Sequence, residues 1–219
     1  MVVKKSKVSK PVKKESHRKS RELEWVLGVM AGLIILVLLL SSFYHGLNTV
    51  KYNGMTFQKV KVGELVFYYY DYSFKDMEGQ QYHYNLYLRN NPKENNVSLS
   101  GEIILPGDMD IYLSVNSSGL NMCEDSNIAL GTLSNFLTSN LLSIKAAKPD
   151  FLEAKQTNFT FANCKSEPGN VVILVQEGNE TRISKEGNCH IIDVANCEVM
   201  KAVEKFEVQS IADAKSRGQ

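Results

Sequence analysis

The longest apolar segment of the chain lies close to its N-terminus. Residues 25–44 read WVLGVMAGLIILVLLLSSFY, twenty positions without a charge. A helix rises about 1.5 Å per residue, so this length matches the roughly 30 Å hydrocarbon core of a bilayer. Trp25, Phe43 and Tyr44 stand at its ends, where membrane helices often carry aromatic side chains. The pattern predicts one transmembrane helix over residues 25–44.

Two other interpretations of this apolar run compete with a retained anchor. A cleaved signal peptide has an apolar core of about 7–15 residues and a small-residue cleavage site. This run is longer, and residues 41–46 (SSFYHG) form a poor site. A core helix of a soluble protein usually has a polar face, and this run has none. A retained signal anchor is therefore the favoured interpretation.

The polar segment before the apolar run is strongly basic. Residues 1–24 hold nine Lys or Arg against three Glu, whereas Lys51 is the one Lys or Arg in residues 45–53. Basic residues near a membrane end favour the cytoplasmic side. We therefore expect a single-pass cell-membrane protein with residues 1–24 inside and residues 45–219 as an extracytoplasmic domain. The net charge of +1 for the whole chain conceals this asymmetry.

The basic tail, residues 1–24, is rich in Lys and Ser and poor in apolar side chains. Such a segment buries too little apolar surface to fold alone, so we expect it to be disordered. Its expected partner is the anionic inner leaflet, which attracts basic residues by about 1 kcal/mol each. The default interpretation is a topology signal without a partner. Nucleic acid is not expected, because the anchor follows directly.

Within the apolar run, Gly28 and Gly32 are four residues apart. On a helix this spacing forms a flat face on which a second membrane helix can pack. Glycine is also common in membrane helices without any such role. Helix packing through Gly28 and Gly32 is a hypothesis beside that simpler explanation.

Residues 64–75 and 81–89 are dense in aromatic and β-branched side chains, and a polar segment with Gly79 lies between them, which predicts two strands joined by a turn at residues 75–80. With a period of two, four residues of each strand share one face and meet across the hairpin. This aromatic stripe suits either a platform for a ligand such as a sugar or a cross-strand core, and the core is favoured. Its members are Tyr68, Tyr70, Tyr72 and Phe74 facing Tyr82, Tyr84, Leu86 and Leu88.

The external domain divides by pattern into a β-rich part, residues 50–116, and a mixed α/β part, residues 117–210. The predicted class is α+β: one transmembrane helix followed by a disulfide-braced extracytoplasmic domain. Further strands are predicted at residues 97–105, 111–115, 159–161, 171–175, 181–184 and 190–194. Helices are predicted from residue 125 or 126 to 142 and over residues 198–206. The end of the chain, residues 212–219, is expected to be frayed. The continuous apolar run 171–175 is typical of a strand buried on both faces.

All four cysteines, Cys123, Cys164, Cys189 and Cys197, follow the apolar run. An even count confined to an exported domain indicates two disulfides. If residues 189–196 are extended, Cys189 and Cys197 are about 26 Å apart, whereas a disulfide needs Cα atoms about 4.4–6.8 Å apart. Cys123–Cys197 with Cys164–Cys189, and Cys123–Cys189 with Cys164–Cys197, remain. The first is favoured, because Cys123 and Cys197 each follow a strand and open a helix.

Four Asn-x-Ser/Thr sequons lie in the external domain, at Asn96, Asn116, Asn158 and Asn179. Each is a candidate glycosylation site if the host modifies exported proteins. Because the domain is rich in Asn, about two such sequons are expected by chance, so the excess is small.

Cys123 lies between a predicted strand and a predicted helix, and a strand–hairpin–helix segment that begins at Pro168 follows later in the chain. This order of elements looks loosely like the thioredoxin layout. In that layout a thiol at a helix N-terminus is acidified. The resemblance implies a membrane-tethered thiol-disulfide oxidoreductase that uses Cys123. The chain departs from that layout because it has no C-x-x-C motif and Pro168 does not adjoin the strand.

The chain carries none of the zinc-protease, serine-hydrolase or nucleotide-binding motifs. No catalytic residue, metal ligand or cofactor is therefore predicted. The favoured function is an envelope binding or structural protein that contacts another envelope or membrane protein, and the thiol oxidoreductase is the alternative.

Overall fold

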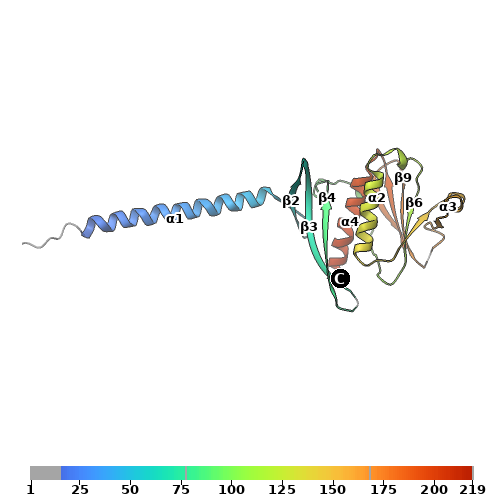
Figure 1. The fold of residues 1–219 in the computed structure, drawn as a ribbon, viewed down its shortest axis with the longest axis horizontal. Coiled ribbons are helices and arrows are strands. Elements are labelled where there is room, and N and C mark those ends of the chain that lie inside the picture. The colour runs from blue at the N-terminus through green and yellow to red at the C-terminus, as the bar shows by residue number, and fades with distance from the viewer. Residues whose placement is uncertain (1–15, 77, 168, 219) are drawn as a thin grey trace, which may run out of the picture. The chain divides into compact units, whose positions relative to one another are not determined.

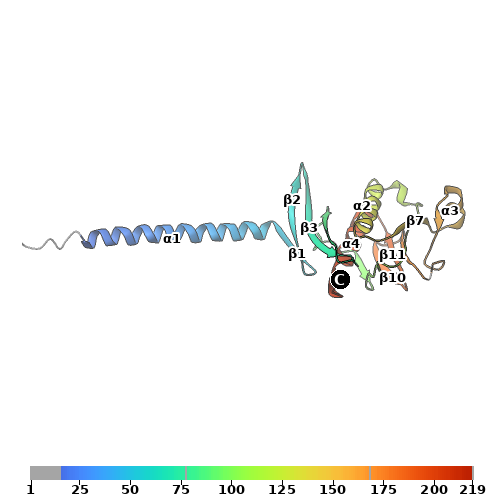
Figure 2. The ribbon, with the colours of Figure 1, turned by 60° about the horizontal axis from the view of Figure 1, so that its bottom comes forward.

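A computed structural model of the chain describes residues 16–76, 78–167 and 169–218 (Figures 1 and 2). The chain forms two compact units, residues 1–48 and residues 49–219. The boundary falls close to the predicted start of the external domain at residue 45.

The first unit contains one long helix, α1 (Ser16–Leu47). Its stretch Leu23–Ser41 is long and apolar enough to cross a membrane, and none of it is buried. The predicted apolar helix is therefore present. It begins at Ser16, so residues 16–24 of the tail that we expected to be disordered are helical. Arg, Leu and Glu favour helix, and they extend one that the apolar run already nucleates. The rest of the predicted tail, residues 1–15, lies outside the described residues.

The second unit opens with a four-stranded antiparallel meander, sheet A. Its strands in spatial order are β1 (Thr49–Tyr52), β2 (Met55–Val62), β3 (Leu65–Lys75) and β4 (Gln81–Leu88). The predicted β3–β4 hairpin is confirmed in its register, with Tyr68 opposite Leu88 and Tyr72 opposite Tyr84. The turn between β1 and β2 is Asn53-Gly54, and both residues have positive φ, as tight hairpin turns require.

Seven further strands form sheet B. They are β5 (Ser98–Ser100), β6 (Ile111–Val115), β7 (Ile144–Lys148), β8 (Thr160–Phe161), β9 (Val171–Glu177), β10 (Arg182–Glu186) and β11 (Cys189–Val194), in the spatial order β5-β10-β11-β9-β6-β7-β8. Strands β6, β7, β8, β9 and β11 are parallel, while β10 is antiparallel to β11. Because β9 is central, Val171 to Val175 are buried on both faces, as predicted.

The helices of the second unit are the short 3₁₀ turn η1 (Leu120–Met122), α2 (Ser126–Ser139), α3 (Phe151–Thr157) and α4 (Val199–Ser216). In Figure 1, α2 and α4 lie between the two sheets, and α3 lies at the opposite end of the unit from sheet A. One core joins these layers: it contains Phe57 and Leu88 of sheet A, Leu133 of α2, Phe206 of α4 and Ile173 of sheet B. The observed class is α+β, as predicted.

Four elements differ from the sequence prediction. The predicted strand at residues 97–105 forms only the short β5 (Ser98–Ser100), because Gly101, with a positive φ, ends it. Helix α4 continues to Ser216 through the segment that we expected to be frayed, since the buried Val208 and Ile211 extend its apolar face. Strand β7 and helix α3 were not predicted.

Candidate binding cleft

A cleft of about 630 Å³ opens in the second unit among sheet A, the C-terminal ends of α2 and α4, and the loop before β6. Its walls are mostly apolar, and they include Phe74, Leu105, Phe136, Leu142, Ile211 and Ala214. Small-molecule and peptide sites are typically concave, largely apolar and of this size. Four segments that are far apart in the sequence line the cleft, so no local sequence motif indicates its presence.

Tyr72 is the main polar group of the cleft wall. Its hydroxyl donates a hydrogen bond of 2.6 Å to Oδ1 of Asn140, the residue that caps α2. The ring packs against Tyr70, Phe74 and Tyr84 with centroids 5.7–6.0 Å apart. Burial raises the pKa of Tyr72, and it raises the pKa of Tyr84 to about 12. Both phenols therefore stay neutral donors at physiological pH.

The predicted aromatic stripe proves to be a half-buried face that packs on the core. Tyr68, Tyr70, Tyr72 and Tyr84 all pack against the core cluster. The interpretation as a cross-strand core is supported for this face, and only its far end, at Tyr72 and Phe74, borders the cleft.

Two glutamates of α4 are buried near this aromatic layer. Glu204 accepts hydrogen bonds from the main-chain N–H groups of Arg89 and Asn90 and from the Asn90 amide. Glu207 is 2% exposed, and its Oε1 has no hydrogen-bond partner. Burial raises the pKa of both carboxyls, and Glu204 raises that of Glu207 further. For Glu207, whose pKa is raised well above its ordinary value, burial favours the protonated form.

Charged side chains stand at the mouth of the cleft. Lys215 donates a 2.5 Å hydrogen bond to the Tyr70 hydroxyl and lies over its ring, and Arg217 pairs with Glu102 at 2.5 Å. Lys75 and Asp108 also border the opening. The arrangement suits a ligand with an apolar part inside the cleft and a polar part at its mouth.

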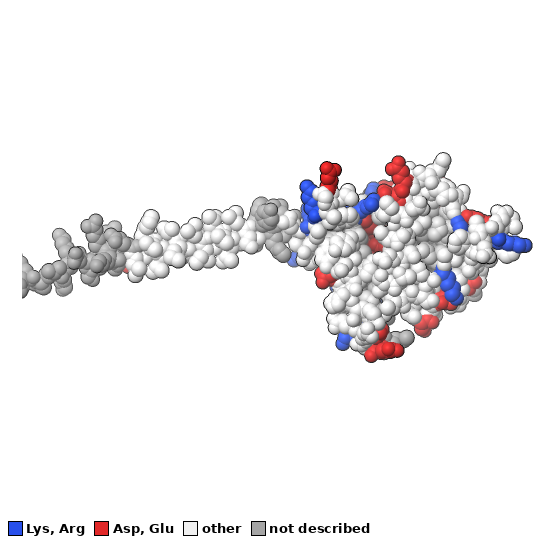
Figure 3. Space-filling model, viewed as in Figure 1, with Lys and Arg blue, Asp and Glu red and all other residues white. Residues whose placement is uncertain are grey.

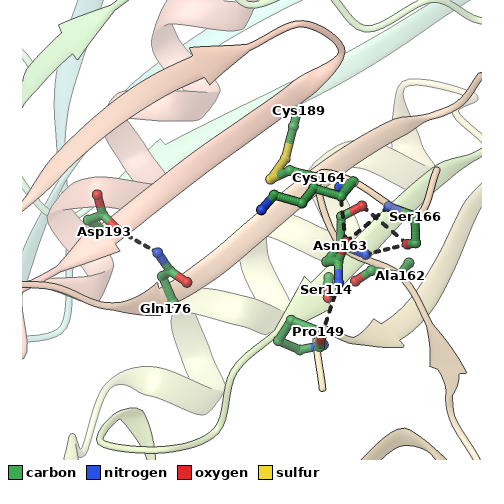
Figure 4. The surroundings of a disulfide bond; sticks show 10 residues. Ser114, Pro149, Ala162, Asn163, Cys164, Ser166, Gln176, Cys189 and Asp193 are labelled. Carbon is green, nitrogen blue, oxygen red and sulfur yellow. Dashed lines mark hydrogen bonds between the residues drawn. A yellow bond between two sulfur atoms is a disulfide. The ribbon is translucent and has the colours of Figure 1, made fainter. Parts of the chain in front are cut away.

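Both predicted disulfides are present with the favoured connectivity. Cys123–Cys197, with Cα atoms 5.3 Å apart, joins the segments that lead into α2 and α4. Cys164–Cys189, with Cα atoms 5.2 Å apart, joins a loop to the first residue of β11 (Figure 4). Among the described residues no cysteine is free. Disulfides are typical of an oxidising compartment.

Side-chain hydrogen bonds hold the loop around Cys164. The Asn163 Oδ1 accepts bonds from the main-chain N–H groups of Lys165 and Ser166, and its amide donates to the Pro149 carbonyl. The Ser114 hydroxyl on β6 donates to the Ala162 carbonyl at 2.7 Å. Figure 4 shows these contacts beside the disulfide. The Cys164–Cys189 bond therefore fixes this loop over the face of sheet B that points away from α2 and α4.

The asparagines of the four sequons differ in their exposure to solvent. Asn96, Asn158 and Asn179 are exposed, whereas Asn116 is half-buried and its Oδ1 accepts a bond from the N–H of Ser118. Asn158 ends α3 with a positive φ of 56°. Their modification stays a prediction.

Gly28 and Gly32 are exposed on α1, and a Cβ added at either would meet no atom within 4 Å. Helix packing through these two glycines also stays a prediction.

The described residues bring no three His, Cys, Asp or Glu side chains together as a metal site would require. His190 is 1% exposed, with its Nε2 3.2 Å from the Ile104 carbonyl and its ring against Phe206, so it belongs to the core. On the face drawn in Figure 3, basic and acidic side chains are interspersed around the margin of a broad uncharged area. That view shows no basic stripe of the kind that binds nucleic acid.

No protein-family model matches the chain, and neither a curated protein nor a solved structure matches it. The apolar helix, the disulfides and the surfaces of the domain are therefore the features that bear on function.

Sequence reasoning missed the buried Glu204 and Glu207 and the cleft itself. It also overlooked the second face of the hairpin, where Phe67, Tyr69 and Tyr87 pack together. The alternation of β3 carried that signal, because every residue between the inward tyrosines points outward.

Proposed function

We propose that the chain is a single-pass, membrane-anchored binding protein whose extracytoplasmic domain takes an apolar group of another envelope or membrane protein into the cleft. The observation that carries this proposal is the cleft of about 630 Å³ with apolar walls and charged side chains at its mouth. Burial of an apolar side chain of the partner in the cleft would contribute to the binding free energy. The charged side chains at the mouth would favour partners in which polar residues flank that side chain.

Two features support placement outside the cytoplasm. Lys and Arg gather before the apolar helix and are scarce directly after it, which favours a cytoplasmic N-terminus. The two disulfides then lie on the far side of the membrane, where oxidising conditions preserve them.

Thiol-disulfide exchange through Cys123 is the competing function. A reactive cysteine is exposed and has a thiolate of low pKa. Cys123 is bonded to Cys197 and is only 9% exposed. We therefore propose a structural role for both disulfides, and labelling of free thiols without reductant tests it. Four protected cysteines agree with the structural role, and rapid labelling of Cys123 contradicts it.

Photo-crosslinking in the native membrane tests the cleft. A benzoylphenylalanine replaces Phe74, which borders the cleft, or in the control Phe151 on α3, which is 60% exposed. We expect a discrete adduct from position 74 alone. Ala214→Phe, which narrows the cleft, should abolish this adduct, while Ala146→Phe on the exposed side of β7 should leave it. Equal adducts from positions 74 and 151 would overturn the assignment.

The anchor and its orientation are tested separately. We expect the full chain to stay in vesicles during an alkaline carbonate wash, and protease added to spheroplasts to digest the domain of residues 49–219. A domain protected until the membrane is dissolved would contradict the extracytoplasmic placement.

A further inference from the structure

The outer face of sheet A carries an apolar surface near the β2–β3 turn. The strand register places Val62 opposite Leu65, Val60 opposite Phe67, and Tyr69 opposite Tyr87. With a period of two, these side chains point away from the core that Tyr68 and Tyr70 contact. We name this set the outer hairpin face: Val60, Val62, Leu65, Phe67, Tyr69 and Tyr87.

Much of the outer hairpin face is open to solvent. Val62, Leu65 and Tyr87 are 57%, 56% and 50% exposed. The aromatic rings of this face pack against one another: the ring centroid of Tyr87 lies 5.0 Å from that of Tyr69 and 6.3 Å from that of Phe67. Single exposed apolar residues are ordinary, but a contiguous group of this kind marks an interaction surface.

The character of this face changes in a fixed order along the strands. The turn end is mostly aliphatic, with Val62 opposite Leu65, and Tyr69 and Tyr87 follow. Beyond the tyrosines the same face becomes polar, with Asp71 opposite Asn85 and Ser73 opposite His83. A membrane surface presents the same order: hydrocarbon, then the headgroup layer where Tyr is enriched, then water.

The covalent link between the apolar helix and the domain is short. One residue, Asn48, separates the end of α1 from β1, and Ser41 ends the apolar stretch. The six helical residues after Ser41 span about 9 Å. Strand β2 runs antiparallel to β1 and Thr49 pairs with Gln58, so Val62 lies about 13 Å beyond Thr49 in the direction opposite to that in which β1 runs. The headgroup layer is thus within reach of the hairpin turn.

We propose that the outer hairpin face inserts into the interface of the membrane that α1 crosses, with Val62 and Leu65 deepest and Tyr69 and Tyr87 at headgroup level. This proposal rests on the anchor of the proposed function, while the cleft plays no part in it. Glu64, exposed in the turn, keeps the insertion shallow because a carboxylate stays in the hydrated layer. The exposed Lys59 and Lys61 of β2 alternate with Val60 and Val62, so they lie on the other side of the hairpin and can extend along it toward lipid phosphates.

Tryptophan fluorescence in the full chain tests this proposal, because Trp25 is the single tryptophan and lies in α1. The chain is reconstituted into vesicles of phosphatidylcholine and phosphatidylglycerol, with or without lipids brominated close to the headgroup. The wild-type chain reports on the anchor. The variant Trp25→Phe/Leu65→Trp reports on the hairpin turn, and Trp25→Phe/Val62→Trp repeats the measurement on the facing strand. The matched control is Trp25→Phe/Leu152→Trp, since Leu152 on α3 is 66% exposed.

We expect brominated lipids to quench tryptophan at positions 65 and 62 and to shift their emission to shorter wavelength, while position 152 stays accessible to aqueous acrylamide. Quenching at positions 65 and 62 no greater than at position 152, with Trp25 quenched in the wild type, overturns the hairpin insertion and leaves the anchor intact. An unquenched Trp25 overturns the anchor and, with it, this proposal.

Discussion

Glu204 on α4 accepts two hydrogen bonds from Asn90, one from its main-chain N–H at 3.0 Å and one from its side-chain amide at 2.8 Å. A third comes from the N–H of Arg89 at 2.5 Å. Asn90 follows β4, where sheet A ends and the chain turns toward the rest of the core. One buried carboxylate thereby satisfies main-chain donors that have left the sheet, and it fastens sheet A to the helical layer.

Removing this carboxylate should be costly. We expect Glu204→Ala to lower the free energy of unfolding by about 2–4 kcal/mol, because two main-chain N–H groups and an amide lose their acceptor inside the protein. Tyrosine circular dichroism during urea unfolding measures the change for the domain, since the one tryptophan lies in α1. The control is Glu198→Ala, which removes an ion pair between Glu198 and Lys201, whose side chains are 34% and 41% exposed, respectively. We expect this variant to lower the free energy of unfolding by about 0.5 kcal/mol. Equal losses would contradict the role of Glu204.

Glu207 should make the domain less stable as the pH rises. Burial, and secondarily the neighbouring Glu204, raise the pKa of Glu207 well above its ordinary value of 4.5. Above pH 4.5 the unfolded chain releases this proton while the folded chain keeps it, so stability falls by at most about 1.4 kcal/mol per pH unit up to the folded pKa. Above the folded pKa the loss is complete.

Glu207→Gln isolates this contribution, because an amide resembles the protonated acid and does not titrate. We expect the unfolding free energy of the variant to exceed that of the wild type by a margin that grows with pH above 4.5. Glu204, Tyr72 and Tyr84 are present in both proteins, so the difference between the two curves reports Glu207 together with its electrostatic coupling to these groups. Parallel pH curves for variant and wild type would show that Glu207 ionises normally.

The two disulfides should differ in their effect on stability. Cys123–Cys197 closes a separation of 74 residues and Cys164–Cys189 one of 25. The loop-closure entropy predicts losses of about 4.5 and about 3.5 kcal/mol when each pair is replaced by serine. Urea midpoints of the two double variants measure the order. A larger loss from the shorter loop would show that packing around Cys164 outweighs the entropy of the unfolded chain.

The sequence predicted the register of the β3–β4 hairpin and the disulfide pairing because each rests on a short-range constraint. Alternation with a period of two fixed which tyrosines face Tyr82 and Tyr84, and the length of an extended strand excluded a Cys189–Cys197 bond. Helix α3 was not predicted, because seven residues are too few to show a clear helical periodicity of apolar side chains. Its one signal was local: Asp150 caps the helix by accepting a 2.8 Å bond from the N–H of Glu153.

The buried acids and the cleft could not be predicted for a different reason. A helix that faces one core buries a single apolar stripe, and on that assumption Glu204 and Glu207 belong to its solvent face. Helix α4 instead lies between two sheets, so polar positions on its second side are covered as well. That arrangement depends on which layers stack, and the residues that decide it are far apart in the sequence.

Glycosylation provides a test of topology that does not disturb the fold. In a host that modifies exported proteins, we expect glycans at the exposed Asn96, Asn158 and Asn179, and little at the half-buried Asn116, whose Oδ1 already bonds the N–H of Ser118. Asn96→Gln, Asn179→Gln and Thr160→Ala should each remove one step of a glycosidase-sensitive mobility shift. The Thr160 variant is preferred at the third sequon, because Asn158 has a positive φ that glutamine tolerates poorly. An unmodified chain from such a host, still firmly held in the membrane, would place the domain on the cytoplasmic side and contradict the orientation inferred from the basic tail.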